Sequence, residues 1–211
     1  MSDKKSQTPR VFIMRHGETE WSRARRLTGS TEIDLNEEGE QQVAAMAKAY
    51  AGAGKTIDPN RLGLVVVSPR KRARRTLDLF LPMSDDGNQK PEVVVDDNVA
   101  ERDHGDYEGL PKEEIQEKRW AMGLDEGTKW NIWRDGCAGG ESNQQVTERV
   151  DRVISQIRDK QSTYMNGEKP ADVLVVSHGS ILAVFAARWD GTDATHGRRY
   201  FLPPAGIARL K

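Results

Sequence analysis

The feature that most constrains the fold is a set of short, uninterrupted apolar runs separated by segments with helical periodicity. Each run has the length of a single β-strand, and together they cover residues 11–14, 64–67, 93–95 and 173–176. Continuous apolar runs of this length are typical of strands that are buried on both faces of a sheet. Strands that alternate with helices of this kind form crossover units. The sequence therefore predicts an α/β fold, a three-layer α/β/α sandwich with a mainly parallel sheet.

Two of the expected helices have clear starting signals. Asn36 is a suitable N-cap for a helix that ends near Gly52, and acidic residues occupy its first turn. A longer helix is expected from about Ser142, because valine and isoleucine residues then recur on one stripe. We further expect helices over residues 111–122 and 181–189, and a basic segment over 70–75 that forms a solvated helix face. An irregular segment is expected over 123–141 and a short last strand over 206–210.

Composition limits the class of protein. The chain has 211 residues and a net charge of −1, which suits one α/β domain and argues against general nucleic-acid binding. Residues 1–9 are expected to form a disordered leader and residues 10–211 a single catalytic domain. No run approaches the ~20 apolar residues of a membrane span. A single cysteine and the lack of a signal-like start favour a cytoplasmic protein. Whether the chain forms a homo-oligomer is left open by the sequence.

Chemically active side chains follow directly after each predicted strand. Arg15 and His16 follow the first run, Arg72 the second, Glu101 the third and His178 the fourth. Because the carboxyl ends of parallel strands meet at one edge of a sheet, we expect these side chains to surround one pocket. Arginines can hold phosphoryl oxygens, a neutral histidine can act as a nucleophile, and a glutamate can transfer protons. The combination favours phosphoryl transfer.

The motifs RHGETEWS, SPRKRARRT, ERDHGDYEG and VVSHGS occur in this order, and they resemble those of the histidine phosphatase superfamily, the phosphoglycerate mutase-like enzymes. The resemblance spans about residues 10–190. RHGETEWS, GDYEG and WNIWRDGC look similar to the fungal sedoheptulose-1,7-bisphosphatase branch. The resemblance implies a phosphoglycerate mutase-like fold and a phosphatase that needs no metal or organic cofactor. Its expected substrate is a small phosphorylated metabolite, such as a sugar phosphate or sedoheptulose 1,7-bisphosphate, hydrolysed through a phosphohistidine.

The resemblance also implies a role for individual residues. His16 becomes phosphorylated, and Glu101 serves as general acid and base. Arg15, Arg72 and His178 hold the transferring phosphoryl group. Contacts with the substrate are implied for Ser22, Thr28, Gly29, His104 and Gly179.

Three positions depart from the pattern of the family. Ser22 stands where an asparagine is frequent, and Leu27 stands where the bisphosphatases tend to carry a tyrosine. Ala183 replaces an arginine that would suit a second phosphate. The physiological substrate therefore stays open. Two alternative functions stay open as well: a phosphoglycerate mutase-type isomerase, and a regulatory protein that binds phosphorylated ligands without turning them over.

Overall fold

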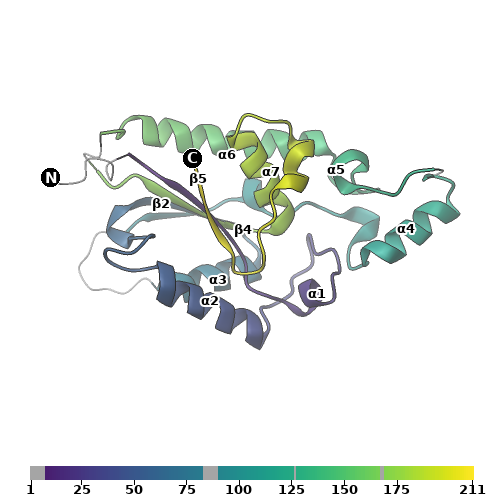
Figure 1. Ribbon diagram of the computed structural model, residues 1–211, viewed down its shortest axis with the longest axis horizontal. Helices are drawn as coiled ribbons and strands as arrows, with labels where there is room; N and C mark the ends of the chain where they lie inside the picture. Colours follow the sequence, from purple (N-terminus) through teal and green to yellow (C-terminus); the bar gives the residue numbers. More distant parts are fainter. Residues whose placement is uncertain (1–7, 83–89, 126, 167–168) are drawn as a thin grey trace.

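A five-stranded sheet forms the middle layer of the protein. The computed structural model describes residues 8–82, 90–125, 127–166 and 169–211. The strands lie in the order β3-β2-β4-β1-β5 (Figure 1). Their bounds are Val11–Arg15 for β1, Leu62–Val67 for β2, Glu92–Val95 for β3, Asp172–Ser177 for β4 and Ile207–Leu210 for β5. Neighbouring strands are parallel except for β5, which is antiparallel to β1, so the predicted mainly parallel sheet is confirmed.

Two helical layers cover the sheet. Helices α6 (Asn143–Ser162) and α7 (Gly179–Trp189) lie on one face, and α2 (Glu37–Tyr50) and α3 (Lys71–Phe80) lie on the other (Figure 1). The predicted three-layer α/β/α architecture is therefore confirmed.

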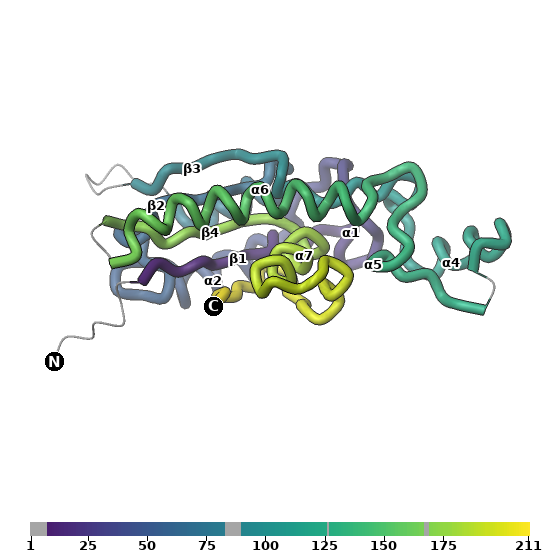
Figure 2. The backbone as a smooth tube through the Cα atoms, turned by 90° about the horizontal axis from the view of Figure 1, so that it is seen from above, coloured from purple at the N-terminus to yellow at the C-terminus, as the bar shows by residue number. Residues whose placement is uncertain are grey.

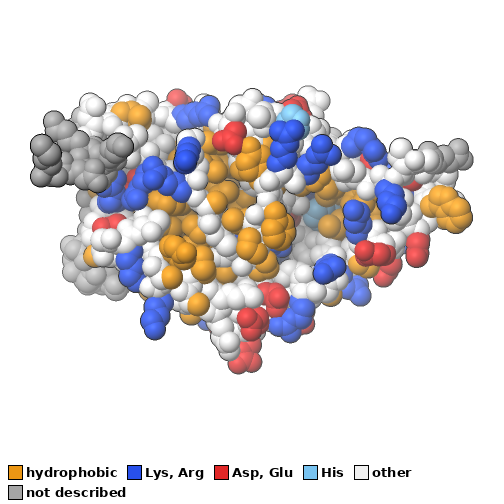
Figure 3. All heavy atoms as spheres, in the orientation of Figure 1, with side chains coloured by type: hydrophobic (Ala, Val, Ile, Leu, Met, Phe, Trp, Pro, Cys, Tyr) orange, Lys and Arg blue, Asp and Glu red, His pale blue; other side chains and the backbone are white. Residues whose placement is uncertain are grey.

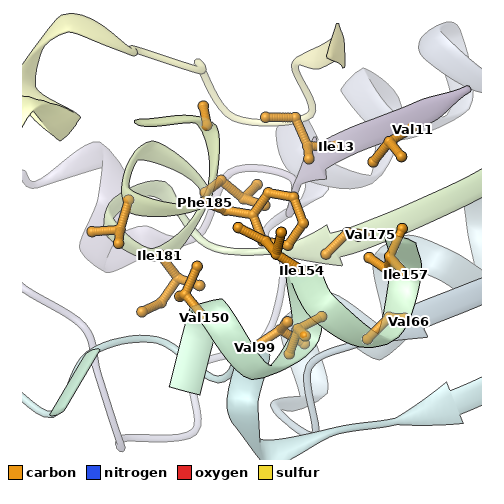
Figure 4. Close-up of a cluster of buried hydrophobic side chains, with 14 of the residues drawn as sticks. Val11, Ile13, Val66, Val99, Val150, Ile154, Ile157, Val175, Ile181 and Phe185 are labelled. Atoms are coloured by element: carbon orange, nitrogen blue, oxygen red, sulfur yellow. The ribbon is translucent and has the colours of Figure 1, made fainter. Parts of the chain in front are cut away.

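Alternate residues of each central strand enter different cores, because successive side chains of a strand point to opposite faces. In β1, Val11 and Ile13 pack under α6 and α7, whereas Phe12 and Met14 pack against α2 and α3. Figure 4 shows the first core, with Phe185 of α7 beside the strands. Burial on both faces explains why β1, β2 and β4 appear in the sequence as continuous apolar runs. The run in β3 differs, because β3 is an edge strand and its Val93 and Val95 are exposed.

The two predicted helix starts are confirmed by their caps. The Asn36 side chain accepts a hydrogen bond from the Gly39 amide at 2.8 Å, at the start of α2. Ser142 and Gln145 form a reciprocal capping box at the start of α6. Each cap satisfies amide groups that the first turn of a helix leaves without partners.

The structure adds short helices within segments that have weak periodicity. Helix α1 (Glu20–Arg23) follows β1, and α5 (Ile132–Asp135) interrupts the segment that was expected to be irregular. Asn131 caps α5, which explains how so short a helix begins. Helix α4 (Lys112–Ala121) lies at one end of the molecule, away from the sheet (Figure 2). Short 3-10 helices occupy Pro59–Arg61, Asp97–Val99, Gly105–Tyr107 and Ala194–Arg199.

Some expectations on the chain as a whole can be compared only in part. Residues 1–7 of the predicted leader lie outside the described residues. Among the described helices, none has both the length and the apolar character needed to cross a membrane.

Candidate active site

The register between β1 and β4 brings the two predicted histidines together. Arg15 pairs with Ser177, so His16 and His178 leave the sheet side by side. The His16 amide donates to the Ser177 carbonyl at 3.0 Å, and the two imidazole centroids are 5.1 Å apart. Both side chains are buried. The carboxyl edge of the sheet thus forms the centre of the site, as predicted.

His16 is held in a form that suits a nucleophile. Its Nδ1 lies 2.7 Å from the Gly17 carbonyl oxygen. Because a carbonyl only accepts, Nδ1 carries the proton and Nε2 keeps its lone pair. Burial, together with the positive charges of Arg15 and Arg72, lowers the pKa of His16 to about 3. The imidazole is therefore neutral near neutral pH.

His178 uses both ring nitrogens within the protein. Its Nδ1 accepts from the Arg72 Nε at 3.2 Å, since a guanidinium only donates. Its Nε2 then carries the proton and donates to the Ser68 Oγ at 2.7 Å. Burial, and next the charge of Arg72, lowers the pKa of His178 well below its usual range. Contact between His178 and a phosphoryl group would therefore replace the bond to Ser68.

Arg72 holds the turn that contains Thr28 and Gly29. Its guanidinium donates to the carbonyls of Thr28, Gly29 and Thr31 at 3.1, 3.0 and 2.9 Å. Arg72 is fully buried, although most of its basic neighbours in α3 are exposed. It is thus the residue of this basic segment that lies beside His178 and the turn, and its contact with a phosphoryl group stays a prediction.

The Gly29 amide is bonded within the protein. It donates to the Glu108 carboxylate at 2.9 Å, and the Thr31 amide donates to the same side chain at 3.0 Å. A Cβ on Gly29 would lie 2.4 Å from the Arg102 carbonyl oxygen, so this close approach requires glycine. The Gly29 amide thus helps to fix the turn, and its contact with substrate stays a prediction.

Glu101 lies at the amino end of α7. Its carboxylate accepts from the amides of Arg102, Ser180 and Ile181 at 2.8, 3.1 and 3.2 Å. The N-cap residue His178 provides no side-chain cap, so Glu101 satisfies amides of the first turn in its place. Burial lowers the pKa of Arg15, and the charge of Glu101 acts in the opposite direction.

A cleft with a volume of about 680 Å³ opens onto these residues. Seven of the predicted site residues line it: Arg15, His16, Ser22, Thr28, Glu101, His104 and Gly179. The other three, Gly29, Arg72 and His178, lie behind this lining. Figure 3 shows basic side chains around the right-hand part of this face.

Sequence reasoning missed several residues of the cleft wall. Arg25 and Arg26 follow α1, Trp133 lies in α5, and Tyr200 and Leu202 precede β5. They come from turns and irregular segments, which have no periodic signal. Arg198, in the adjacent pair Arg198-Arg199, also lines the cleft.

The buried histidines predict a loss of stability in acid. The unfolded chain binds a proton on His16 near pH 6.5, whereas the folded chain does so only near pH 3. The free energy of unfolding should therefore fall as the pH drops through this window, by up to about 1.4 kcal/mol per pH unit for this group. Chemical denaturation at several pH values measures the slope. A His16→Asn variant should show a slope shallower by one proton, and parallel curves for the two proteins would contradict the assignment.

Comparison with known proteins agrees with this geometry. The family model of the histidine phosphatase superfamily (branch 1) matches residues 11–211. Sedoheptulose 1,7-bisphosphatase of Saccharomyces cerevisiae is 42% identical over 187 residues, which cover 88% of this chain and 69% of that protein. An acid phosphatase of Mycobacterium tuberculosis is 34% identical over 198 residues, covering 94% and 84% of the two chains. The solved structure of a Mycobacterium tuberculosis open reading frame product superposes with a TM-score of 0.75 at 31% identity, covering 95% and 90%. The chain belongs to the histidine phosphatase superfamily.

Proposed function

We propose that this protein is a phosphatase that hydrolyses a small phosphorylated metabolite through a phosphohistidine at His16. The observation that carries the proposal is the state of His16, which is neutral and keeps a free Nε2 lone pair in a cleft that it shares with Arg15 and Glu101. A neutral imidazole beside a guanidinium suits attack on a phosphate monoester.

In the first step, His16 Nε2 attacks phosphorus in line with the leaving oxygen. The N–P bond forms as the P–O bond to the sugar or other alcohol breaks, and protonated Glu101 gives its proton to the departing alkoxide. In the second step, water attacks the phosphohistidine and Glu101 takes the proton from that water. Inorganic phosphate leaves, His16 regains its lone pair, and Glu101 is protonated again.

The positive charge that this chemistry needs comes from the arginines. Arg15 donates from Nη1 to the Leu202 carbonyl at 3.0 Å, which fixes the guanidinium, while its buried Nε has no partner among the described residues. We propose that this Nε–H is directed to a phosphoryl oxygen. Arg72 adds a second positive charge behind the cleft lining. His178 contributes its Nε2–H as a donor to the phosphoryl group if the ring turns away from Ser68. Fixed positive charges of this kind stabilise the equatorial oxygens of the transferring group.

Phosphate release from a panel of compounds tests the proposal. The panel contains sugar monophosphates and bisphosphates, 3-phosphoglycerate and p-nitrophenyl phosphate, each with and without EDTA. We expect release from the sugar and aryl phosphates at the same rate in EDTA, because arginines supply the charge. Strong inhibition by EDTA would contradict the metal-free mechanism. Isomerisation of 3-phosphoglycerate without phosphate release would favour the mutase, and no turnover of any compound would favour a binding protein.

A further inference from the structure

The cleft wall contains three arginines that the proposed hydrolysis at His16 does not use: Arg25, Arg26 and Arg198. Four arginines line it, and Glu101 is the one carboxylate among the described residues of the wall. Arg15 is half-buried beside His16, whereas Arg25, Arg26 and Arg198 are exposed and so lie at the mouth. The whole chain has a net charge of −1, so this concentration of one sign is a local property of the cleft.

Two of these arginines have no partner among the residues that the structure describes. The Arg26 guanidinium donates to the Gly109 carbonyl at 2.9 Å. The guanidinium groups of Arg25 and Arg198 form neither a hydrogen bond nor an ion pair with any residue that the structure describes. By contrast, Arg119 and Arg188 each pair with an aspartate at 2.9 and 2.8 Å. Two free guanidinium groups therefore face one cleft from segments that are far apart in the sequence.

Arg25 occupies a backbone conformation that an arginine adopts at a cost. Its φ is 55°, in the left-handed region that favours glycine and asparagine. The turn is fixed on both sides, because the Arg25 amide donates to the Ser22 carbonyl and the Arg26 amide to the Trp21 carbonyl. A strained residue that lines a binding cleft is a candidate for a functional side chain.

A close packing contact positions the backbone at Arg198. It follows Gly197 in the 3-10 helix Ala194–Arg199, and a Cβ on Gly197 would lie 2.7 Å from the Trp133 ring. The absence of a side chain at Gly197 thus lets this helix rest on Trp133, which itself lines the cleft. The packing fixes the backbone that carries Arg198.

We propose that Arg25 and Arg198 form a subsite that binds a second phosphate of the substrate while the first phosphate lies at His16. This assignment rests on the proposed phosphatase function. A phosphate monoester carries a charge of about −1.5 to −2 at neutral pH, which two unpaired guanidinium groups match. The cleft volume of about 680 Å³ is within the range of sites that hold a whole small-molecule ligand. Arg25 and Arg198 would supply the positive charge that is missing at Ala183, where an arginine would suit a second phosphate.

Matched substrates test the subsite. We would measure kcat/KM for fructose 1,6-bisphosphate, fructose 1-phosphate and fructose 6-phosphate. The wild-type protein should prefer the bisphosphate, and Arg25→Asn and Arg198→Gln should each reduce that preference by about tenfold, mainly through KM. Asparagine tolerates the left-handed conformation, so Arg25→Asn should unfold at or above the wild-type temperature. Arg209→Gln, an exposed arginine outside the cleft lining, is the control and should keep the preference.

Equal losses for the bisphosphate and the monophosphates, or no preference in the wild type, would overturn the subsite. Preference for 6-phosphogluconate over the bisphosphate would overturn it too, because the second anion would then be a carboxylate. Binding of the same sugars to His16→Asn, measured by calorimetry, separates the two proposals. A binding preference for the bisphosphate that depends on Arg25 and Arg198 would uphold the subsite. Failure of the wild-type protein to hydrolyse p-nitrophenyl phosphate would contradict the phosphatase function and leave that binding result unaffected.

Discussion

Replacement of His16 by alanine is expected to lower kcat by about 10⁴-fold or more, because the nucleophile is lost and the remaining groups only position the substrate. The effect should be similar for sugar phosphates and for p-nitrophenyl phosphate, since every substrate needs the same N–P bond. Phosphate release under saturating substrate measures it.

His16→Asn is the matched control for structure. The asparagine amide can still donate to the Gly17 carbonyl, which now holds the His16 Nδ1–H at 2.7 Å. It has no lone pair on nitrogen for attack, so activity should be lost to the same extent while the unfolding temperature stays near that of the wild type. Turnover by either variant within tenfold of the wild type would remove His16 from the nucleophilic role.

Replacement of Glu101 by glutamine is expected to produce the second largest loss, on the order of 10²- to 10⁴-fold with sugar phosphates. A sugar alkoxide is a poor leaving group and needs the proton from Glu101. The p-nitrophenolate ion leaves without a proton, so formation of the phosphoenzyme from p-nitrophenyl phosphate should be much less affected. Single-turnover release of nitrophenol and steady-state release of phosphate from sugars measure this difference.

Glu108→Gln is the control for this experiment. Glu108 also accepts backbone amides, those of Gly29 and Thr31, but it does not line the cleft. Its substitution should loosen the turn that contains Thr28 and Gly29, which also contacts Arg72, and lower the rates with both substrates alike. If Glu101→Gln behaved in the same way, Glu101 would be a structural cap of α7 and not the acid.

Much of the fold could be predicted because its signals are local. The apolar runs of β1, β2 and β4 are buried on both faces, and Asn36 and Ser142 form their own caps. The antiparallel direction of β5 could not be predicted, since it depends on pairing with β1 almost two hundred residues earlier in the chain. Helix α5 was missed because one capped turn leaves no periodic pattern.

The centre of the site was predictable for a similar reason. His16 and His178 follow strands, so the parallel register alone places them together. The contacts of Arg72 with backbone carbonyls, and the bond between His178 and Ser68, arise from packing between segments far apart in the sequence and have no sequence signal. The same is true of Arg25, whose left-handed backbone appears only in the structure.

The most direct test of the central claim is to trap the phosphoenzyme. The wild-type protein would be mixed with excess substrate, quenched at alkaline pH within the first turnover, and analysed by peptide mass spectrometry. We predict one phosphoryl group on His16, sensitive to acid and absent from His16→Ala. A burst of product with no phosphoryl group on the protein, or with the group on His178, would contradict the account.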